Sequence, residues 1–520
     1  MQVHQYVSNG FHMILDVPSG SVHVGDELFY EAVEAYTEAL ANAVVPAAEA
    51  NAPAAAASTP PVADFVIPDA RALEIPADTV LVAAETALRE RKHLPKGEAP
   101  DEVDEVFAEI AQLRREGGLF SPEPYRPSVE KFAERPTVVK ALCLHIAHDC
   151  NLACRYCFAE EGEYHGRRAL MSLEVGKKAL DFLAANSGTR KNLEVDFFGG
   201  EPLLNWQVVK DLVAYGREIE ERMKDGPAPK QFRFTLTTNG VLLNDEIMEF
   251  CNREMHNVVL SIDGRKEVHD RMRPFRKGQG SYDVILPKFL KFAKMRRELG
   301  LSYYVRGTYT HWNLDFSEDV LHLADLGFDQ ISVEPVVAPP TEDYALRPED
   351  LPVLMDQYDR LAREMICRKK EGRAFNFFHF MIDLSGGPCV YKRLSGCGSG
   401  TEYLAVTPWG DFYPCHQFVG TECFLLGNVD DGIVEKDIVR EFKKVNVYSK
   451  KECSQCFARF YCSGGCAANS YNFTGGINDI YEIGCRLQRK RVECALMLKA
   501  AEAGMEEEAD KDKQGTGSSV

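Results

Sequence analysis

The stretch CNLACRYCF, Cys150–Phe158, carries three cysteines in the spacing C-x3-C-x2-C. It directly follows the apolar run ALCLHIA, residues 141–147. A short apolar run of this length is typical of a buried strand. In parallel α/β folds, ligands bind at the carboxyl ends of the strands. The stretch therefore predicts a thiol-bearing ligand site just beyond a buried strand.

The same alternation of strand and loop recurs from Ala141 to about Pro335. Short apolar runs alternate there with amphipathic stretches such as SLEVGKKALDFLAAN. The runs that we predict as strands are ALCLHIA, LEVDFFGG, FRFTLTTNG, NVVLSIDG, YYVRGTYT and ISVEPVV. Strands that alternate with helices form βα units with right-handed crossovers and a parallel sheet. We therefore expect an α/β fold over residues 138–340, a partial (β/α)6 barrel of the TIM type.

The residues before the barrel predict a separate small α/β module over residues 1–125. VHQYV and FHMILDV are typical of strands, VHV of a third short strand, and Asp26 is placed to cap the helix that follows. Two further helical patterns lie near residues 79–92 and 102–116. Residues 43–63, AVVPAAEANAPAAAASTPPVA, are rich in Ala and Pro without periodicity, which predicts a flexible insert inside the module.

Three further segments follow the barrel. Residues 341–387 are predicted as a helical bridge, and residues 388–500 are rich in Cys, Gly and aromatic residues with few long periodic elements. A segment of that composition needs cross-links or metal to be stable. The tail, EEEADKDKQGTGSSV at residues 506–520, is highly charged, and we expect it to be disordered.

The composition limits the class of protein. The chain has 520 residues and a formal net charge of −19, which argues against broad nucleic-acid binding because a phosphate backbone needs a basic face. We find no apolar run long enough to span a membrane and no signal-peptide pattern at the start. Sixteen cysteines are present, most of them in tight spacings. The missing signal-peptide pattern predicts a cytoplasmic protein, and in a cytosolic chain clustered cysteines more often bind metal than form disulfides.

Three close thiols without a fourth beside them indicate a particular metal centre. Three thiolates can hold a 4Fe–4S cube at three corners and leave one iron open for a substrate or cofactor. We assign this role to the cysteine triad Cys150, Cys154 and Cys157. Two alternatives remain open. The thiols are incidental, or they bind zinc with a fourth ligand from His145, His148 or His165.

The triad motif resembles that of radical S-adenosylmethionine (SAM) enzymes, and FFGGEP and SIDG extend the resemblance along the barrel. The resemblance implies that the amine and carboxylate of SAM bind the open iron. It also implies a reductive cleavage that yields a 5′-deoxyadenosyl radical, which takes a hydrogen atom from the substrate. The residues expected to bind the cofactor are Phe158, Gly199, Gly200, Glu201, Asn239, Ser261, Asp263 and Arg306.

These residues have distinct expected roles. The two glycines of FFGGEP let backbone carbonyls approach the SAM ammonium group, and Glu201 can hold their turn. The Ser and Asp of SIDG suit the ribose or the carboxylate end of SAM, and Arg306 suits the carboxylate. The alternative is that these are ordinary polar residues at strand ends.

The Cys-rich segment contains CSQCFARFYCSGGC, whose spacing C-x2-C-x5-C-x3-C matches the SPASM domain of peptide-modifying radical SAM enzymes. That resemblance implies two auxiliary 4Fe–4S clusters, and three clusters in all. The ligands of one auxiliary cluster would be Cys453, Cys456, Cys462 and Cys485. The ligands of the other would be Cys397, Cys415 and Cys466, with Cys389 as a candidate fourth. Without Cys389, that cluster would keep an iron open for a substrate thiolate.

A finer resemblance spans nearly the whole chain. The stretches HQY…SGSVHV, ALCLHIAHDCNLACRYCFAEEGEYHG, VDFFGGEPLLNW, RMRPFRKGQGSYD and SGCGSGTEYLAVTPWGDFYPCHQFVG are similar to the maturases of SCIFF peptides. Those enzymes form thioether bonds from a peptide cysteine to an acceptor residue, typically threonine, in six-cysteine precursors. The N-terminal module then resembles a RiPP recognition element, a winged-helix-like unit that binds a leader peptide as an added strand. The Ala/Pro insert departs from that pattern.

The resemblance also implies partners and leaves rivals open. The expected partners are a Cys-rich precursor peptide with its leader and an electron donor of the flavodoxin or ferredoxin type, with no nucleic acid and no membrane. One rival is another modification by the same machinery, such as formylglycine formation on sulfatases or a carbon–carbon crosslink. The other rival is non-enzymatic, an iron–sulfur electron carrier or a peptide-binding protein.

Overall fold

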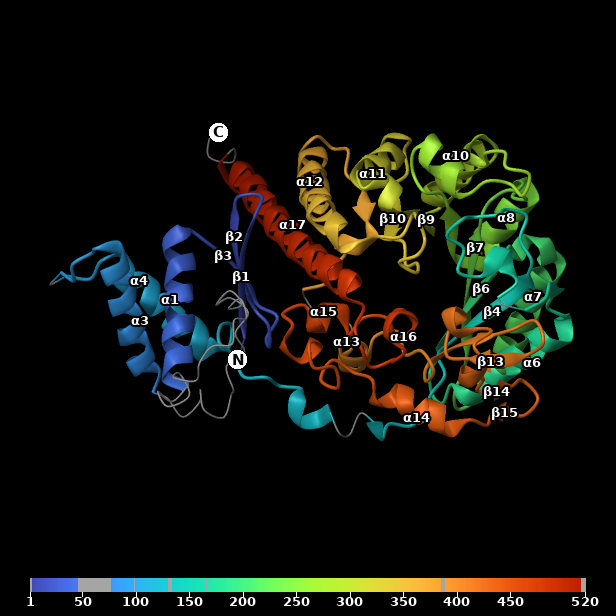
Figure 1. Cartoon of the computed structure of the whole chain (residues 1–520), viewed down its shortest axis with the longest axis horizontal. Coiled ribbons are helices and arrows are strands. Elements are labelled where there is room, and N and C mark those ends of the chain that lie inside the picture. The colour runs from blue at the N-terminus through green and yellow to red at the C-terminus, as the bar shows by residue number, and fades with distance from the viewer. Residues whose placement is uncertain are drawn as a thin grey trace.

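The computed structural model describes residues 2–44, 76–97, 99–129, 133–164, 166–384 and 389–515. Nearly all of the predicted Ala/Pro insert, together with His165, lies outside the described residues. The described part forms a small N-terminal module and a larger α/β body, and a long C-terminal helix runs between them (Figure 1).

The centre of the larger body is a parallel sheet. Its six strands are β4 (Ala141–His148), β6 (Asn192–Gly199), β7 (Gln231–Thr238), β8 (Met255–Ser261), β9 (Ser302–Tyr309) and β10 (Gln330–Pro335). Neighbours in this order are all paired in parallel. The fold class expected from the sequence is confirmed, because each predicted apolar run forms one of these strands.

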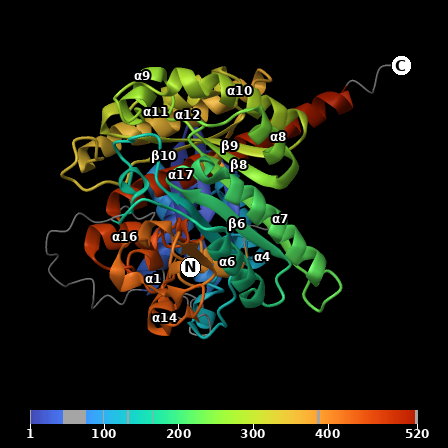
Figure 2. The same ribbon diagram turned by 90° about the vertical axis from the view of Figure 1, so that its right-hand side faces the viewer.

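Helices connect the strands and lie along the outside of the sheet (Figures 1 and 2). They are α6 (Leu173–Asn186), α7 (Trp206–Met223), α8 (Asp245–Glu254), α9 (Lys266–Met272), α10 (Tyr282–Glu298) and α11 (Phe316–Asp325). Their buried residues recur at helical spacing, as Val209, Leu212, Val213 and Gly216 do in α7. A side chain at Gly216 would lie 2.6 Å from the Phe234 ring, so glycine lets α7 approach the sheet closely. None of the described helices is long and apolar enough to cross a membrane.

The N-terminal module contains the elements that the sequence predicts. The antiparallel strands β1 (Val3–Ser8), β2 (Phe11–Asp16) and β3 (Val22–Gly25) precede the helices α1 (Glu27–Val44), α3 (Ala77–Lys92) and α4 (Glu102–Glu116). Asp26 caps α1 as expected, because its carboxylate accepts the Phe29 amide at 2.8 Å.

The three-stranded sheet of this module has two buried faces. Ile14 packs with the module's own helices, whereas its neighbours Met13 and Leu15 belong to the core of the larger body. This is the alternation of a strand whose successive side chains point to opposite faces. The sheet is therefore the layer that joins the module to the rest of the molecule.

The Cys-rich segment does not stand apart from the barrel. Its strand β12 (Tyr403–Val406) pairs in parallel with β4, and β13 (Asp411–Tyr413), β14 (Gly427–Asn428) and β15 (Gly432–Ile433) extend the sheet further. At the opposite edge, the predicted helical bridge contributes α12 (Leu351–Lys370) and then β11 (Asn376–Phe377), which pairs with β10. These strands are too short to leave a pattern in the sequence.

The remaining elements are short, except for the last helix. They are β5 (Ala169–Leu170), α13 (Val390–Ser395), α14 (Lys436–Lys444), α15 (Arg459–Cys462), α16 (Ala467–Thr474) and α17 (Glu482–Gly515). The expectation of a disordered tail from residue 506 is wrong as far as residue 515, because α17 continues to Gly515. Glu and Lys make up half of residues 506–515, and both favour continuation of a helix that has already begun.

Candidate active site

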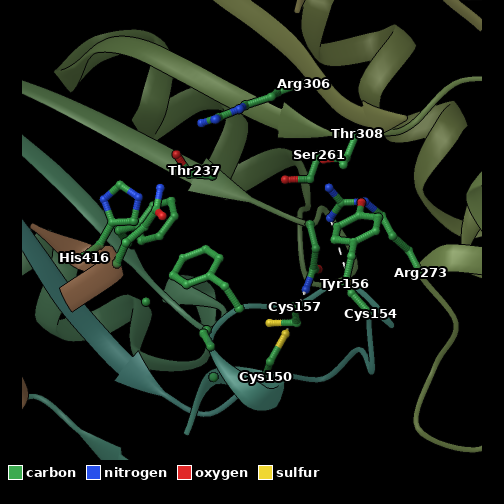
Figure 3. Close-up of a pocket in the computed structure, with 18 of the residues that line it drawn as sticks. Cys150, Cys154, Tyr156, Cys157, Thr237, Ser261, Arg273, Arg306, Thr308 and His416 are labelled. Atoms are coloured by element: carbon green, nitrogen blue, oxygen red, sulfur yellow. Dashed lines mark hydrogen bonds between the residues drawn. The ribbon is translucent and has the colours of Figure 1, made fainter. Parts of the chain in front are cut away.

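A cavity of about 260 Å³ opens at the carboxyl ends of the barrel strands (Figure 3). All three cysteines of the triad line it. Of the other predicted cofactor-binding residues, Phe158, Gly199, Gly200, Asn239, Ser261 and Arg306 also line it. The structure thus brings together residues from several strand ends that are distant in sequence, as the parallel-sheet argument requires.

Backbone contacts hold the loop that carries the triad. The Ala153 amide donates to the Pro274 carbonyl and the Arg155 amide donates to the Met272 carbonyl, both at 2.9 Å. Inside the loop, the Cys157 amide donates to the Cys154 carbonyl at 3.1 Å. The end of α9 and the residues directly after it therefore hold the triad loop in place by backbone hydrogen bonds.

The donor set suits an iron–sulfur cluster. Burial raises the pKa of both the Cys150 and the Cys154 thiol to about 12, and nearby thiols add to each shift. Such thiols keep their protons until a metal displaces them, since metal ligation deprotonates a coordinating thiol. Three thiols that line one cavity, with polar space beyond them, fit a cluster held at three corners.

The glycine turn after β6 lies against the triad loop. A side chain at Gly200 would lie 2.0 Å from the Asp149 carbonyl oxygen, and Gly199 has a φ of +115° that favours glycine. Glu201 is fully buried and accepts hydrogen bonds from the Thr238 hydroxyl and the Asn239 amide, each at 2.8 Å. Burial raises the pKa of Glu201 to about 7. Its carboxylate fixes the turn and does not line the cavity.

Asp263 is placed differently from its expected role. It is fully buried, and its carboxylate accepts hydrogen bonds from the Tyr156 hydroxyl, the Arg273 guanidinium and the Thr308 amide at 2.7 to 3.1 Å. It is not among the residues that line the cavity. The geometry makes it an anchor for Tyr156 and Arg273, which do line the cavity.

Arg273 is a site residue that sequence reasoning missed. Its guanidinium approaches the Cys154 sulfur to 4.0 Å, and Figure 3 shows the two residues on the same side of the cavity. Asp263 beside it holds the pKa of Arg273 well above its usual range, against the opposing effect of burial. The sequence feature that could have pointed to Arg273 is the Arg-rich stretch RMRPFR, which follows SIDG closely.

The opposite rim of the cavity carries a charged pair. Arg306 is half-exposed and forms an ion pair with Glu334 at 2.8 Å. On the triad side, the Asn239 side chain donates to Asn151 at 2.7 Å and lies 3.6 Å from the Cys150 sulfur. The rim is therefore polar on both sides of the thiols.

His416 is a second residue that the sequence did not single out, and it comes from the Cys-rich segment. It follows Cys415 directly, lines the cavity, and lies 3.2 Å from the Tyr403 hydroxyl. Its ring centroid lies 5.6 Å from that of Phe158 and 5.1 Å from that of Phe198. The cavity therefore has walls from two parts of the chain.

The cysteines of the C-terminal segment form two groups. Four of them line a separate cavity of about 290 Å³, namely Cys453, Cys456, Cys462 and Cys485. In the second group, Cys466 and Cys397 are close enough to Cys415 to help raise the pKa of its thiol, which burial raises most. Cys389 is exposed at the start of α13. The structure thus gathers these cysteines in two places, and their roles as cluster ligands, that of Cys389 included, stay predictions.

Lys450 lies between these two groups. Its ammonium group donates to the carbonyl oxygens of Gly464 and Asp479, both at 2.9 Å. Burial lowers the pKa of Lys450, while cysteines from both groups oppose that shift. Of the cysteines that fit no spacing, three are buried and two are exposed: Cys143, Cys251, Cys494, Cys367 and Cys423.

Comparison with known proteins agrees with this geometry. Residues 144–326 match the radical SAM superfamily. The serine-type anaerobic sulfatase-maturating enzyme of Klebsiella aerogenes is 24% identical over 373 residues, which cover 69% of this chain and 85% of that protein. The radical SAM cyclopropyl synthase TigE of Paramaledivibacter caminithermalis is 22% identical over 410 residues, which cover 72% and 78%.

The fold also matches a solved structure. Native anSMEcpe with bound AdoMet superimposes with a TM-score of 0.57 at 19% identity, over 70% of this chain and 99% of that one. The likeness concerns the fold. Together with the family match and the thiol-lined cavity at the strand ends, it identifies residues 144–326 of this chain as a radical SAM domain, which a Cys-rich C-terminal segment follows.

Proposed function

We propose that this protein is a radical SAM peptide maturase that forms intramolecular thioether crosslinks in a ribosomally made six-cysteine precursor. The crosslinks run from cysteine sulfurs to an acceptor residue, for which threonine is the expected identity. The main observation in support is that His416, which is adjacent in sequence to Cys415, lines the same cavity as the triad. A radical site beside a second thiol-bearing segment suits a reaction that joins a sulfur to a carbon.

The triad residues would hold a 4Fe–4S cluster with SAM on its open iron. Bound there, the pair would supply reductive cleavage of SAM to a 5′-deoxyadenosyl radical that abstracts hydrogen. The glycine turn offers backbone carbonyls to the SAM ammonium group, and buried Glu201 keeps that turn in place. Arg306 and Ser261 face the cavity where the carboxylate and ribose of SAM would bind.

The cavity also has an apolar side. Phe158, Phe198, Val336 and Val337 give the cavity an apolar wall. A peptide bound against this wall would shield a carbon radical from water and side reactions. We further propose that the two cysteine groups of the C-terminal segment each hold an auxiliary cluster. A donor cysteine of the peptide would then approach from the Cys415 side.

A second candidate function uses the same site. Relatives named as sulfatase-maturating enzymes favour a modification of a single residue on a protein, such as formylglycine formation. That reaction needs the triad and the SAM cavity but no precursor with many cysteines. A non-enzymatic electron carrier has less support, because it needs no cavity of about 260 Å³ next to its cluster.

The first test is co-expression with a six-cysteine precursor, followed by mass spectrometry. Each thioether removes a pair of hydrogen atoms from the peptide and one thiol that an alkylating reagent can label. The matched control is the triple variant Cys150→Ala, Cys154→Ala and Cys157→Ala, which should leave the peptide unmodified. A precursor that keeps all its thiols while a sulfatase-derived peptide gains an aldehyde would favour the second candidate.

A further inference from the structure

One strongly basic stretch lies beside the triad loop in an otherwise acidic chain. Residues 264–277, GRKEVHDRMRPFRK, contain six Arg or Lys and only two Asp or Glu, whereas the whole chain has a formal net charge of −19. The carbonyl groups of Met272 and Pro274 in this stretch accept hydrogen bonds from the triad loop. Basic residues are therefore concentrated at the outer support of the triad loop. Four of them form ion pairs with carboxylates, namely Arg265, Lys266, Arg273 and Arg276.

Two arginines of this region stack on one tryptophan. The Arg271 guanidinium lies 4.6 Å from the Trp312 ring centroid, and the Arg155 guanidinium lies 5.6 Å from it. Arg155 is covalently adjacent to Cys154, and Trp312 follows the end of β9. Arg155, Trp312 and Arg271 thus form a continuous surface, which we call the arginine–tryptophan ridge.

The ridge retains positive charge toward solvent. Arg155 and Arg271 are both exposed, and neither forms an ion pair within the ranges that the structure describes. Neighbouring arginines, in contrast, have their charge paired with carboxylates. Arg265 forms ion pairs with Asp315 and Asp319, and Arg276 forms one with Asp149. Arg271 and Trp312 also line a hollow of about 430 Å³, whose lining includes the acidic residues Glu267 and Asp315. The unpaired positive charge is therefore that of the ridge itself and not of the hollow. A pair of exposed, stacked guanidiniums beside a hollow suits docking of an acidic protein surface.

We propose that the arginine–tryptophan ridge is the docking surface for an acidic one-electron donor protein of the flavodoxin class. This inference rests on the proposed function, because radical SAM chemistry consumes an electron that must come from outside. The cavity itself is where SAM and the peptide would bind, so a donor protein is left with the outer side of the loop. A donor that contacts Arg155 is only a few covalent bonds from the ligand Cys154.

The electron balance of the step is simple. The reduced flavin of the donor would lose one electron and become the semiquinone, and a cluster held by the triad would accept that electron. Bound SAM would take up this electron when its sulfur–C5′ bond breaks, which gives methionine and a 5′-deoxyadenosyl radical. Complementary charge at such a contact raises the association rate and makes binding sensitive to salt.

The test compares Arg271 variants by direct binding. Oxidised flavodoxin is titrated with wild-type protein, Arg271→Glu and Arg271→Lys, and the dissociation constant is measured at low and high salt. Arg271→Glu should weaken binding by about ten-fold or more and flatten the salt dependence, whereas Arg271→Lys should have a much smaller effect. The matched control is Arg253→Glu, because Arg253 also stacks on an aromatic ring, that of Phe250 in α8.

A kinetic readout separates docking from catalysis. 5′-Deoxyadenosine formation is measured with photoreduced flavodoxin and, in parallel, with dithionite, a reductant too small to need a docking surface. Arg271→Glu should raise the apparent KM for flavodoxin and leave the dithionite-driven rate at the wild-type level. Wild-type flavodoxin affinity in Arg271→Glu, or an equal loss with both reductants, would overturn the docking proposal. A wild-type protein that cleaves no SAM with dithionite would instead overturn the proposed function.

Discussion

At the residue scale, the site depends on a few positions that accept only one type of residue. Gly200 is one, because its Cα lies against the backbone of the triad loop. Glu201 is another, since it satisfies three donors of neighbouring loops while buried. A buried carboxylate with its hydrogen bonds satisfied fixes a unique backbone arrangement, and its loss leaves unpaired donors that cost free energy.

The first prediction concerns Gly200→Ala. The added methyl group would lie 2.0 Å from the Asp149 carbonyl oxygen, and both groups are backbone-anchored, so the triad loop must shift. We expect loss of SAM binding, measured by equilibrium dialysis on the reconstituted protein. The control is Gly504→Ala in α17, where no atom lies within 4 Å and alanine should stabilise the helix by about 0.5–1 kcal/mol. Wild-type SAM affinity in Gly200→Ala would contradict the close-packed turn.

At the scale of elements, the joint between the N-terminal module and the Cys-rich segment contains a buried ion pair. Arg459 of α15 contacts Glu123 at 2.7 Å, with side chains only 3% and 10% exposed. The same carboxylate accepts the Tyr448 hydroxyl at 2.7 Å. Beside it, the His4 ring stacks on Phe457 with centroids 3.5 Å apart. Phe457 directly follows the ligand candidate Cys456, so the module contacts the segment that carries this candidate ligand.

The second prediction follows from that joint. Glu123→Ala leaves the Arg459 guanidinium buried without its charge partner, which costs about 3–5 kcal/mol when such pairs are broken. We expect a lower urea midpoint, followed by circular dichroism, and faster hydrogen exchange in β1 and α15. Glu174→Ala, which removes an exposed partner of Lys178, should cost less than about 1 kcal/mol. If the two variants unfold alike, the buried pair does not hold the joint.

At the scale of the whole molecule, the sheet is the structure that places the thiol groups. The barrel strands carry the triad, and β12 joins the same sheet beside β4, which directs the Cys415 loop to the cavity. The group of Cys453, Cys456, Cys462 and Cys485 combines α15 and the turn before it with the start of α17, which contains Cys485. The candidate cluster sites are thereby distributed along one continuous body.

The third prediction is the iron content of that body. Three 4Fe–4S cubes would give about twelve iron atoms per chain after anaerobic reconstitution, and the triad-to-alanine variant should retain about eight. Iron is measured by colorimetric assay against protein from amino-acid analysis. Cys251→Ala is the control, because this buried thiol lies in the barrel core and should not change the count. An unchanged count in the triad variant would exclude a cluster at these cysteines.

The sequence by itself determined the features that are local in the chain. Strand periodicity, the helices between strands, the triad spacing and the glycine turn are each set by residues within a few positions of one another, and the strands and helices form where they were expected. The Asp26 cap was predictable for the same reason, since a cap needs only the next turn of backbone.

Only the tertiary structure decided the contacts between distant segments. Asp263 turned inward to Arg273 and Tyr156, and His416 reached the cavity across a long stretch of sequence from the triad. The pairing of β12 with β4 has no local signature, because a short strand gains its stability from the neighbour that it joins. Periodicity records which face of an element is buried. It carries no information about which distant element covers that face, and that choice rests on packing of the complete chain.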